Sequence, residues 1–373
     1  MEGRDSAYVK KKPCIIIRAD GGSGLGMGHL VRSMTLAKGF ATAGFTPVYA
    51  VKNAEDSVIN FMKKTGVRFF SMVDVKDGDW DRESRLMAGL IEDTKPAVVF
   101  LDIDNAQTRK NLKGYGGYLD ALRSGGTALA AIDGPSAPDY FYELFIAPYD
   151  GARRINPDSR TKHLLGADFV ILRDEFVLAA RQKRTIRKSA DRVLISMGGA
   201  DPKRLTEKIL KALCPVTSKE LQLKVLLGPA FTEQQHSAII NLAGEFGQRC
   251  EVLKNSSEMA ALMLWADVGL ISGGLTKYEL AATGTPGISL AQNEEEDRLT
   301  ALFATQKTLR HLGEGSAPAE EKLAKALLEL LSDSDARKRM SSAGKHRVDG
   351  LGLDRVIQET TRLCNRIRKE CPS

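Results

Sequence analysis

The sequence predicts an α/β protein with two doubly wound, Rossmann-like domains that face each other across a cleft. Short apolar, β-branched segments alternate with longer amphipathic segments along almost the whole chain. The apolar segments are continuous rather than interrupted by polar residues, which is typical of parallel strands covered by helices on both faces. The chain has 373 residues, and a single core stops growing at about 250–300 residues, so we expect two such domains in tandem.

The first domain is expected to hold the earlier series of strands. These segments are short runs of apolar, mostly β-branched residues, and they are Cys14–Ala19, Thr46–Val51, Val67–Met72, Ala97–Asp102, Ala128–Asp133 and Glu143–Ala147. Stretches with helical periodicity lie between several of them, namely His29–Ala43, Asp56–Lys64 and Gln107–Arg123.

The second domain repeats this alternation. Its expected strands are Arg192–Met197, Gln222–Leu227, Cys250–Lys254, Asp267–Ser272 and Gly287–Leu290. Its expected helices are Leu205–Leu213, Thr232–Ala243, Ser257–Trp265 and Lys277–Thr283. The segment from Asp333 onward also reads as helix.

Domain boundaries follow from these two series. They are a tail over 1–12 that we expect to be disordered, a first domain over 13–180, a linker over 181–191, a second domain over 192–345, and a terminal helix over 346–373. Whether that helix packs on the first domain is left open by the sequence. The basic run Arg181–Lys188 is interpreted as a solvated helix end or linker, with contact to a phosphate or a membrane as the alternative.

The composition excludes several classes of protein. The net charge is +7, but aromatic residues make up only 6% and the basic residues are spread out, so we expect no nucleic-acid partner. No apolar run approaches the about 20 residues of a membrane-spanning helix, and residues 1–13 lack the apolar centre of a signal peptide. We therefore expect a cytoplasmic protein without stable membrane insertion. None of the five cysteines has metal-ligand spacing. The acidic run Glu294–Asp297 is interpreted as the first turn of a helix, with a metal site as the minor alternative because no His or separated third carboxylate completes it, so we expect no metal.

The first motif that carries chemistry is a glycine-rich segment that ends at His29. It follows the apolar strand Cys14–Ala19 and opens a helix, and backbone amides such as those near Gly26 and Gly28 can bind an anion there. The spacing G-x-G-x-x-G would need glycine in place of Met27 or His29, so a nicotinamide dinucleotide site is disfavoured. A neutral His29 at the helix start can act as a general base. The alternative is a capping or core histidine.

The second motif is a pair of glycine turns in the second half. Gly198 and Gly199 follow one strand; Gly273, Gly274, Leu275 and Thr276 follow another and open a helix, where their amides could hold a diphosphate. Glu279 lies one turn beyond Thr276, on the same face, and its carboxylate suits the two hydroxyls of a ribose. The alternative is tight helix–sheet packing, which glycines also serve.

Polar residues at the ends of other strands complete the candidate site. Gln292 and Asn293 offer donors and acceptors for sugar hydroxyls or acetamido groups. Asp102 and Asp133 end strands of the first domain and could orient a substrate hydroxyl or the imidazole, with capping of the following segment as an equal alternative. In open parallel sheets ligands lie beyond the carboxyl ends of the strands, so we expect all of these residues at the cleft.

These motifs resemble a known family. R-A-D-G-G-S-x-L-G-x-G-H-x-x-R-S, S-M-G-G-A-D-P and S-G-G-L-T-x-Y-E-L-A-A-x-G-T-P resemble the UDP-sugar hydrolases of pseudaminic acid synthesis and the related spore-coat polysaccharide proteins, over roughly residues 13 to 310. The segment Leu164–Phe176 matches the family's domain-crossing segment. The second half is also similar to the N-acetylglucosamine transferase of peptidoglycan synthesis. The resemblance implies a glycosyltransferase-B-like (GT-B-like) fold with UDP held mainly by the second domain.

The resemblance also implies residue roles and an activity. His29 corresponds to the catalytic histidine, Glu279 to the ribose-binding glutamate, and the backbone near Leu253 to the part that contacts the edge of the base. The implied reaction is hydrolysis of a UDP-activated amino or deoxy sugar, such as UDP-2,4-diacetamido-2,4,6-trideoxy-β-L-altropyranose, to free sugar and UDP with inversion and without a cofactor.

Two alternatives to hydrolysis remain. They are a GT-B glycosyltransferase of surface polysaccharide synthesis and a non-catalytic nucleotide-sugar-binding protein. Leu275 stands where the hydrolases often have serine, and Gln292-Asn293-Glu294 replaces their asparagine–glutamine pair, so the sugar is less determined than the nucleotide. The resemblance leaves room for association with other enzymes of a sugar pathway.

Overall fold

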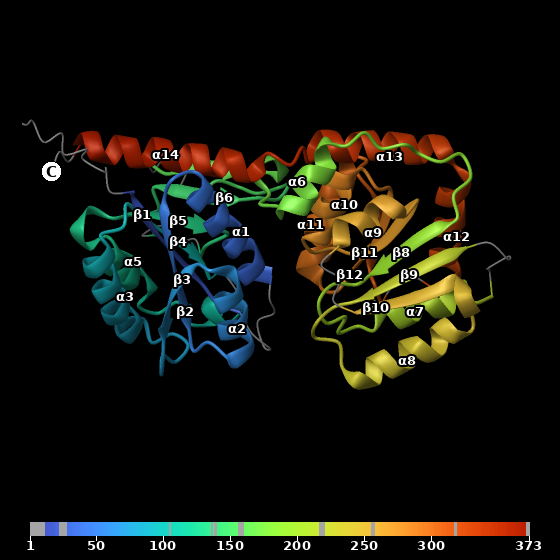
Figure 1. Ribbon diagram of the computed structural model, residues 1–373, viewed down its shortest axis with the longest axis horizontal. Coiled ribbons are helices and arrows are strands. Elements are labelled where there is room, and N and C mark those ends of the chain that lie inside the picture. Colours follow the sequence, from blue (N-terminus) through green and yellow to red (C-terminus); the bar gives the residue numbers. More distant parts are fainter. Residues whose placement is uncertain are drawn as a thin grey trace, which may run out of the picture.

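Two lobes, each built on its own parallel sheet, make up the computed structural model (Figure 1). It describes residues 12–21, 28–103, 106–135, 137, 140–155, 160–215, 221–254, 258–316 and 319–370. The predicted tail, apart from residue 12, and the candidate Gly26 lie outside these ranges.

The first lobe contains a sheet of seven parallel strands. They are β1 (Cys14–Ala19), β2 (Thr46–Lys52), β3 (Arg68–Met72), β4 (Val98–Asp102), β5 (Ala128–Ile132), β6 (Leu144–Ala147) and β7 (Lys162–Leu165). Their spatial order is β3-β2-β1-β4-β5-β6-β7. The order reverses between β1 and β4, whose last residues Ala19 and Asp102 lie side by side in the register. Such a reversal opens a crevice at the carboxyl edge of the sheet.

Helices cover both faces of this sheet. They are α1 (Gly28–Thr42), α2 (Asp56–Thr65), α3 (Trp80–Thr94), α4 (Ala106–Lys110) and α5 (Tyr115–Leu122). Ile15 and Ile17 pack in the core beneath α1 and α2, whereas Ile16 packs beneath α3 and α5. The helix predicted over 107–123 is wrong as a single element. It is interrupted because Gly114 adopts a left-handed conformation, with φ of 86°, and starts α5 anew.

The second lobe contains a sheet of six parallel strands. They are β8 (Arg192–Ser196), β9 (Gln222–Leu227), β10 (Cys250–Lys254), β11 (Val268–Ser272), β12 (Gly287–Ala291) and β13 (Arg310–Glu314). Their order is β10-β9-β8-β11-β12-β13, which reverses between β8 and β11. The prediction of two doubly wound parallel α/β units is therefore confirmed.

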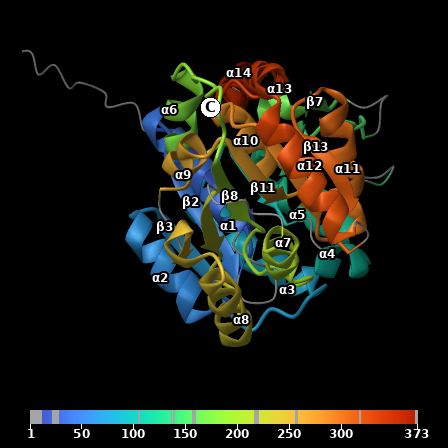
Figure 2. The same cartoon turned by 90° about the vertical axis from the view of Figure 1, so that its right-hand side faces the viewer.

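The helices of the second lobe also form two layers. They are α7 (Leu205–Leu213), α8 (Glu233–Gly244), α9 (Met259–Trp265), α10 (Thr276–Thr283), α11 (Glu294–Thr305) and α12 (Glu320–Ser332). Cores beneath α7, α8 and α12 on one face and beneath α9 and α10 on the other enclose the sheet (Figure 2).

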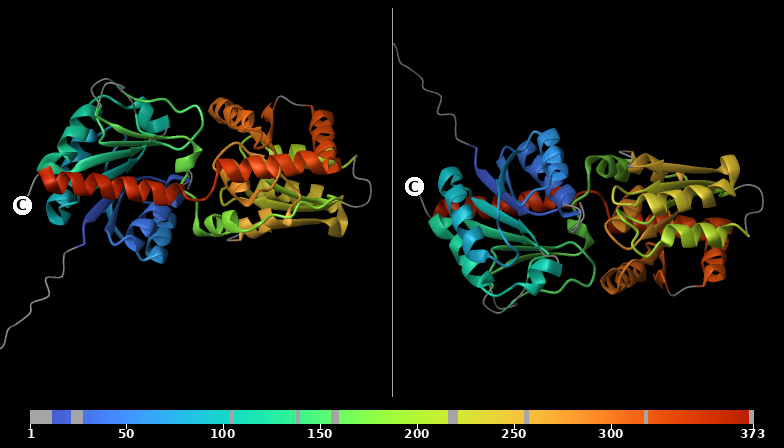
Figure 3. Two further views of the ribbon diagram at one scale, coloured as in Figure 1. Left: turned by 90° about the horizontal axis from the view of Figure 1, so that it is seen from above. Right: turned by 90° about the horizontal axis from the view of Figure 1, so that it is seen from below.

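The chain passes between the lobes twice. It first leaves the first lobe through α6 (Asp174–Arg181), and it returns from α13 (Ser334–Arg347) to α14 (Gly352–Glu370). These last two helices lie end to end along both lobes (Figure 3). Gly350, with φ of 81°, lies in the turn that separates them. From α14, Val356, Leu363 and Cys364 enter the core of the first lobe.

The basic run before β8 is engaged within the protein. Arg184 donates hydrogen bonds to the carbonyls of Met263, Leu264 and Ala266 at the end of α9. Arg187 lies 2.8 Å from a carboxylate oxygen of Asp267. These contacts tie the linker to the second lobe. In the described part of the chain, no helix combines the length and the apolar character needed to cross a membrane.

Candidate functional site

His29 lies at the crevice of the first sheet, on the second residue of α1. Its Nδ1 atom is 2.7 Å from Oδ1 of Asp102, the last residue of β4. The imidazole is 24% exposed and the carboxylate is fully buried. The buried carboxylate of Asp102 therefore orients the imidazole through its Nδ1 edge, and part of the ring stays exposed.

The hydrogen bond to Asp102 defines the tautomer of the neutral ring. An ionised carboxylate only accepts hydrogen bonds, so Nδ1 of His29 carries the proton and donates it. Nη2 of Arg32 is also 3.3 Å from Nδ1, but two donors cannot bond to each other. The unprotonated atom of the neutral imidazole is therefore Nε2, which has the lone pair that a general base needs.

Asp102 is held in its ionised form by its neighbours. Nε of Arg32 donates at 3.1 Å and Oγ of Ser33 at 2.6 Å, and Nη2 of Arg32 contacts the other carboxylate oxygen. Burial alone would raise the pKa of Asp102. The charge of Arg32 and the hydrogen bond from His29 outweigh burial and keep this pKa well below its usual range.

Arg32 and Ser33 were not among the residues predicted for the site. A signal was available, because they follow His29 by three and four positions and therefore share its face of the helix. Both also belong to the motif that carries the family resemblance.

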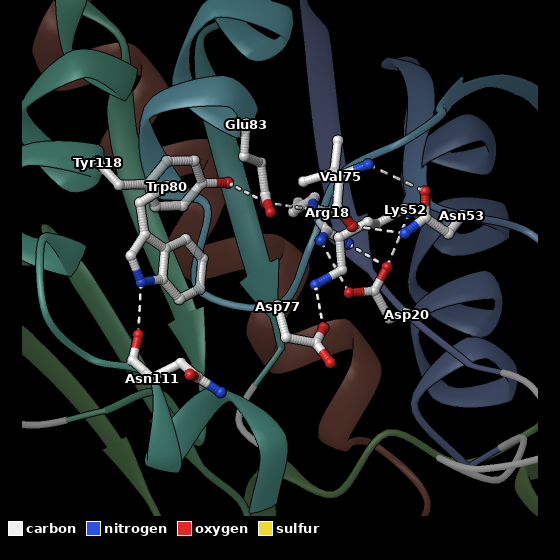
Figure 4. A network of polar contacts seen from close by, with 10 residues as sticks. All are labelled: Arg18, Asp20, Lys52, Asn53, Val75, Asp77, Trp80, Glu83, Asn111 and Tyr118. Atoms are coloured by element: carbon white, nitrogen blue, oxygen red, sulfur yellow. Dashed lines mark hydrogen bonds and ion pairs between the residues drawn. The ribbon is translucent and has the colours of Figure 1, made fainter.

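A buried charged network anchors the strand that leads toward His29 (Figure 4). Arg18 donates to both carboxylate oxygens of Asp20, at 2.5 and 2.7 Å, and to Glu83 at 2.8 Å. Tyr118 donates to the same oxygen of Glu83, and the backbone N–H of Lys52 donates to Asp20. Asp20 is thereby fixed where β1 ends, just before the glycine-rich segment.

A cleft of about 850 Å³ lies between the lobes. Asp133 and Tyr149 line it from the first lobe, and Arg298 and Leu302 line it from α11 of the second lobe. Burial lowers the pKa of Arg32, but Asp102 and, more weakly, Asp133 raise it above its usual value. Asp133 is therefore within electrostatic reach of Arg32, which connects the His29 site to this cleft.

Asp133 was predicted as the last residue of a strand over Ala128–Asp133, but β5 ends at Ile132. It follows the strand in a left-handed conformation, with φ of 56°. Its carboxylate accepts a hydrogen bond from the Tyr149 hydroxyl at 2.7 Å. The backbone turn thus directs Asp133 into the cleft between the lobes.

A second pocket, of about 220 Å³, lies in the second lobe. Of the candidate residues, the following line it: Gly198, Gly199, Thr276 and Glu279. The other lining residues are Arg173, Ser196, Leu226, Leu227, Gly228, Pro229 and Met259. Leu253 is half-buried and pairs in the sheet with Leu226, so its backbone runs beside this pocket.

Glycines allow the backbone turns to meet at the floor of this pocket. A Cβ atom on Gly228 would lie 2.5 Å from the carbonyl oxygens of Gly198 and Gly199. Gly198 itself needs a left-handed φ of 84°. A Cβ on Gly273 would lie 2.5 Å from Oγ1 of Thr300. Packing of this density was the alternative that the sequence left open, and it coexists here with an open pocket.

Glu279 and Arg173 form an ion pair at the pocket wall. Nη2 of Arg173 is 3.2 Å from Oε1 of Glu279, and Nη1 of Arg173 is 2.6 Å from Glu175. Burial raises the pKa of Glu279, and Arg173 opposes this shift. Arg173 was not among the predicted site residues, although it lies in the segment over 164–176 that matches the family.

The remaining candidates lie around the start of α11 and α1. Gln292 is buried, and its amide contacts Met197, Asp201 and the backbone N–H of Lys203. Asn293 is exposed and caps α11 by accepting from the N–H of Glu296 at 2.9 Å. Gly28 is exposed at the start of α1, with open space where a Cβ would lie. Contact of Gln292 with a sugar would require its present hydrogen bonds to change.

Gly274 and Leu275 complete the turn into α10. Leu275 is the N-cap residue of that helix, and its side chain makes no capping hydrogen bond. The side chain of Leu275 therefore does not cap the first backbone N–H groups of α10. Across the described ranges, no group of three or more His, Cys, Asp or Glu residues could hold a metal ion.

The sequence of the chain is similar to that of a polysaccharide biosynthesis protein. No protein-family model matches it. The spore coat polysaccharide biosynthesis protein SpsG of Bacillus subtilis is 25% identical over 355 residues, which cover 91% of this chain and 95% of SpsG.

Solved structures share the fold. MurG of Acinetobacter baumannii superposes with a TM-score of 0.66 at 13% identity, over 94% of this chain and 100% of MurG. The UDP-GlcNAc 2-epimerase of Neisseria meningitidis bound to UDP-GlcNAc gives a TM-score of 0.62 at 11% identity, over 94% of this chain and 100% of the epimerase. The chain thus has the GT-B-like fold of MurG, and its sequence is similar to SpsG over nearly its whole length.

Proposed function

We propose that the protein binds a UDP-activated amino or deoxy sugar and hydrolyses it to the free sugar and UDP. The observation that carries this proposal is the hydrogen bond between His29 and Asp102, which leaves Nε2 of a partly exposed imidazole as the acceptor of a proton. The similarity to SpsG and the structural likeness to proteins solved with UDP or UDP-sugars support the choice of substrate.

UDP is assigned to the 220 Å³ pocket of the second lobe. The diphosphate would extend from this pocket past Thr276 and bind the amides of Gly274, Leu275 and Thr276 at the start of α10, where the helix dipole favours negative charge. Glu279 would bind the two ribose hydroxyls. Because Arg173 now occupies its carboxylate, substrate binding would exchange this ion pair for hydrogen bonds to the ribose, and the backbone near Leu253 would meet the base.

The chemical step requires water and His29. Nε2 of His29 takes a proton from the water while the water oxygen forms a bond to the anomeric carbon. The bond from that carbon to the β-phosphate oxygen breaks, its electron pair leaves with UDP, and the configuration inverts. Asp102 orients the ring and stabilises the imidazolium that forms. A general base of this kind contributes about 10²–10⁴ in rate.

The leaving group needs charge stabilisation rather than an acid. UDP departs as a stable anion, and the growing negative charge falls on the oxygen nearest the start of α10. Backbone N–H groups that are already oriented there stabilise this charge without reorganisation. The two lobes thus divide the work, with the base on one sheet and the leaving-group site on the other.

The test is a His29→Ala variant. We expect it to lose about 10²–10⁴ in turnover while retaining affinity for UDP, because His29 and the UDP pocket lie on different lobes. His236→Ala, on the surface helix α8, is the matched control and should behave as the wild type. Wild-type turnover of the true substrate by His29→Ala would refute the role of this residue.

A glycosyltransferase is the second candidate, and one observation favours it. The cleft of about 850 Å³ beside Asp133 and Arg298 is separate from the UDP pocket and has room for an acceptor. Incubation with UDP-sugars and no acceptor separates the two activities, since only hydrolysis releases free sugar. Binding of UDP without turnover of UDP-sugars, whether or not an acceptor is added, would instead indicate a non-catalytic nucleotide-sugar-binding protein.

A further inference from the structure

Lys277 is a buried lysine beside the proposed diphosphate site. It is the second residue of α10 and is only 3% exposed. Its Nζ donates a hydrogen bond to the carbonyl oxygen of Gly273 and lies 4.9 Å from the centre of the Tyr278 ring. Nothing in the proposed function uses this residue so far.

The carbonyl of Gly273 is held from two sides. Besides Lys277, Oγ1 of Thr300 on α11 donates to it at 3.1 Å. Any side chain on Gly273 would collide with Thr300, so the turn has little room to move. The Gly273 carbonyl belongs to the same planar peptide unit as the N–H of Gly274, the first amide of the series over Gly274–Thr276, so fixing the carbonyl fixes the direction of that N–H.

A purely structural role explains this lysine poorly. Burying an ammonium group is costly unless it is paired, and a cation in the first turn of a helix is opposed by the helix dipole. The contacts of its Nζ, with the Gly273 carbonyl and the Tyr278 ring, are with uncharged groups, and within the described ranges the ammonium group forms no ion pair with a carboxylate. An apolar side chain would fill the same space without either cost. A multiply charged anion bound at this helix start would offset both.

The groups facing Lys277 come from three elements. Glu295 and Glu296 lie on α11, Asp150 lies in the loop after β6, and Tyr278 is its neighbour on α10. Asp150 is itself paired with Arg347 at the end of α13. Glu296 accepts a hydrogen bond from the N–H of Gln292 at 3.0 Å. These carboxylates attract the ammonium group without contacting it.

We propose that Lys277 is a positioning residue for the diphosphate, whose ammonium group holds the Gly273 carbonyl, aligns the N–H of Gly274 and adds positive charge behind the bound anion. This inference rests on the proposed function of the pocket. The residue acts through the turn rather than on the reacting atoms.

The protonation of Lys277 makes this role measurable. Burial lowers its pKa to about 8, while Glu296, Asp150 and Glu295 oppose the shift. A bound diphosphate favours the ammonium form and therefore raises the pKa again. The affinity for UDP must then fall as the pH rises through about 8, roughly tenfold between pH 7 and pH 9 by linkage. Ionisation of the terminal phosphate of UDP changes affinity in the opposite direction, so such a fall is diagnostic.

The experiment is calorimetric titration of the full chain with UDP at pH 7, 8 and 9. We expect the UDP affinity of the wild type to fall about tenfold between pH 7 and pH 9. Lys277→Arg stays charged, so its affinity should remain near the wild-type value at pH 7 across this range. Lys277→Met should bind UDP about tenfold more weakly than the wild type at pH 7, and its affinity should not change with pH. Lys345→Met is the matched control. That amine is also partly buried with a lowered pKa, but it donates to Gln182 at the end of α6, so its removal should preserve the wild-type slope.

Thr300→Val keeps the test decisive if the Lys277 variants do not fold. It removes the neutral donor to Gly273 and should weaken UDP binding equally at each pH while leaving the slope intact. A flat wild-type profile, or a wild-type slope in Lys277→Met, would overturn the role of Lys277 alone. Absence of UDP binding to the wild type at every pH would overturn the proposed function itself.

Discussion

Replacing Asp102 with asparagine tests how the His29 site is held together. The substitution keeps the shape of the side chain but exchanges one acceptor oxygen for an NH₂ donor. The carboxylate now receives hydrogen bonds from three side chains, those of His29, Arg32 and Ser33. The amide cannot satisfy all of them in either orientation.

Each orientation of the amide has a distinct cost. In both orientations the guanidinium of Arg32 loses its buried counter-charge, and an NH₂ group in place of Oδ2 opposes the donor Nε of Arg32. An NH₂ group in place of Oδ1 opposes Nη2 of Arg32 and also faces His29, so that Nδ1 must accept and the ring proton moves to Nε2, which removes the base. Hydrogen bonds to charged groups contribute about 1.5–3 kcal/mol each, and breaking a buried ion pair costs about 3–5 kcal/mol. We therefore expect a loss of about 3–5 kcal/mol in the stability of the first lobe.

Two assays follow for Asp102→Asn. Urea unfolding monitored in the first lobe should show the destabilisation at pH 7, and turnover should fall by about 10²–10⁴ with UDP affinity unchanged. The folded-state pKa of Asp102 is lowered, so its stabilising contribution is present above about pH 4 and is lost as the pH falls below it. The stability difference between wild type and variant should therefore shrink on acidification. A folded variant with turnover within threefold of the wild type would refute this role of Asp102.

Two further substitutions probe the pocket to which UDP is assigned by the proposed function. Glu279→Gln should weaken UDP binding about tenfold in calorimetry, because the charged acceptor proposed for the ribose hydroxyls is lost. Glu175→Gln changes the other carboxylate that contacts Arg173 and should bind UDP within about twofold of the wild type. Equal losses of UDP affinity in the two variants would contradict the assignment of Glu279. Gly228→Ala should lower the melting temperature and abolish UDP binding, because its Cβ would lie 2.5 Å from two backbone oxygens. Gly199→Ala is the control, since a Cβ has free space there and the melting temperature should stay at the wild-type value. A stable Gly228→Ala variant that binds UDP would show that the backbone around Gly198, Gly199 and Gly228 can move apart.

The buried strands of the fold were predictable from the sequence, whereas one edge strand of each sheet was not. Central strands such as β4 and β11 are buried at each residue, so they appear as continuous apolar runs. The strands β7 and β13 were not predicted. Both lie at an edge of their sheet, and their sequences KHLL and RHLGE hold only one short apolar pair or none. The other two edge strands, β3 and β10, were predicted because RFFSM and CEVLK each keep a central apolar pair.

In the candidate site, features set by neighbouring residues in the sequence were predictable, and contacts between residues far apart in the sequence were not. The position of His29 followed from a strand, a glycine-rich segment and a helix start that are adjacent in sequence. The ion pair between Arg173 and Glu279 joins residues 106 positions apart, and no local pattern reports such a pair. The left-handed turn at Asp133 is likewise accompanied by a tertiary hydrogen bond to Tyr149, which no local pattern reports.

The packing of α14 on the first lobe has a consequence for how the protein is made. β1 to β7 are synthesised early, yet Val356 and Leu363 of their core belong to α14. At the usual 5–20 residues per second, the ribosome needs roughly 10–40 s to translate the roughly 200 residues between β7 and the end of α14. During that interval the hydrophobic side of α1 around Gly39, which meets Leu353 and Ile357 in the finished protein, stays without its cover. A nascent chain halted before α14 is therefore a natural client for chaperones that recognise apolar surface.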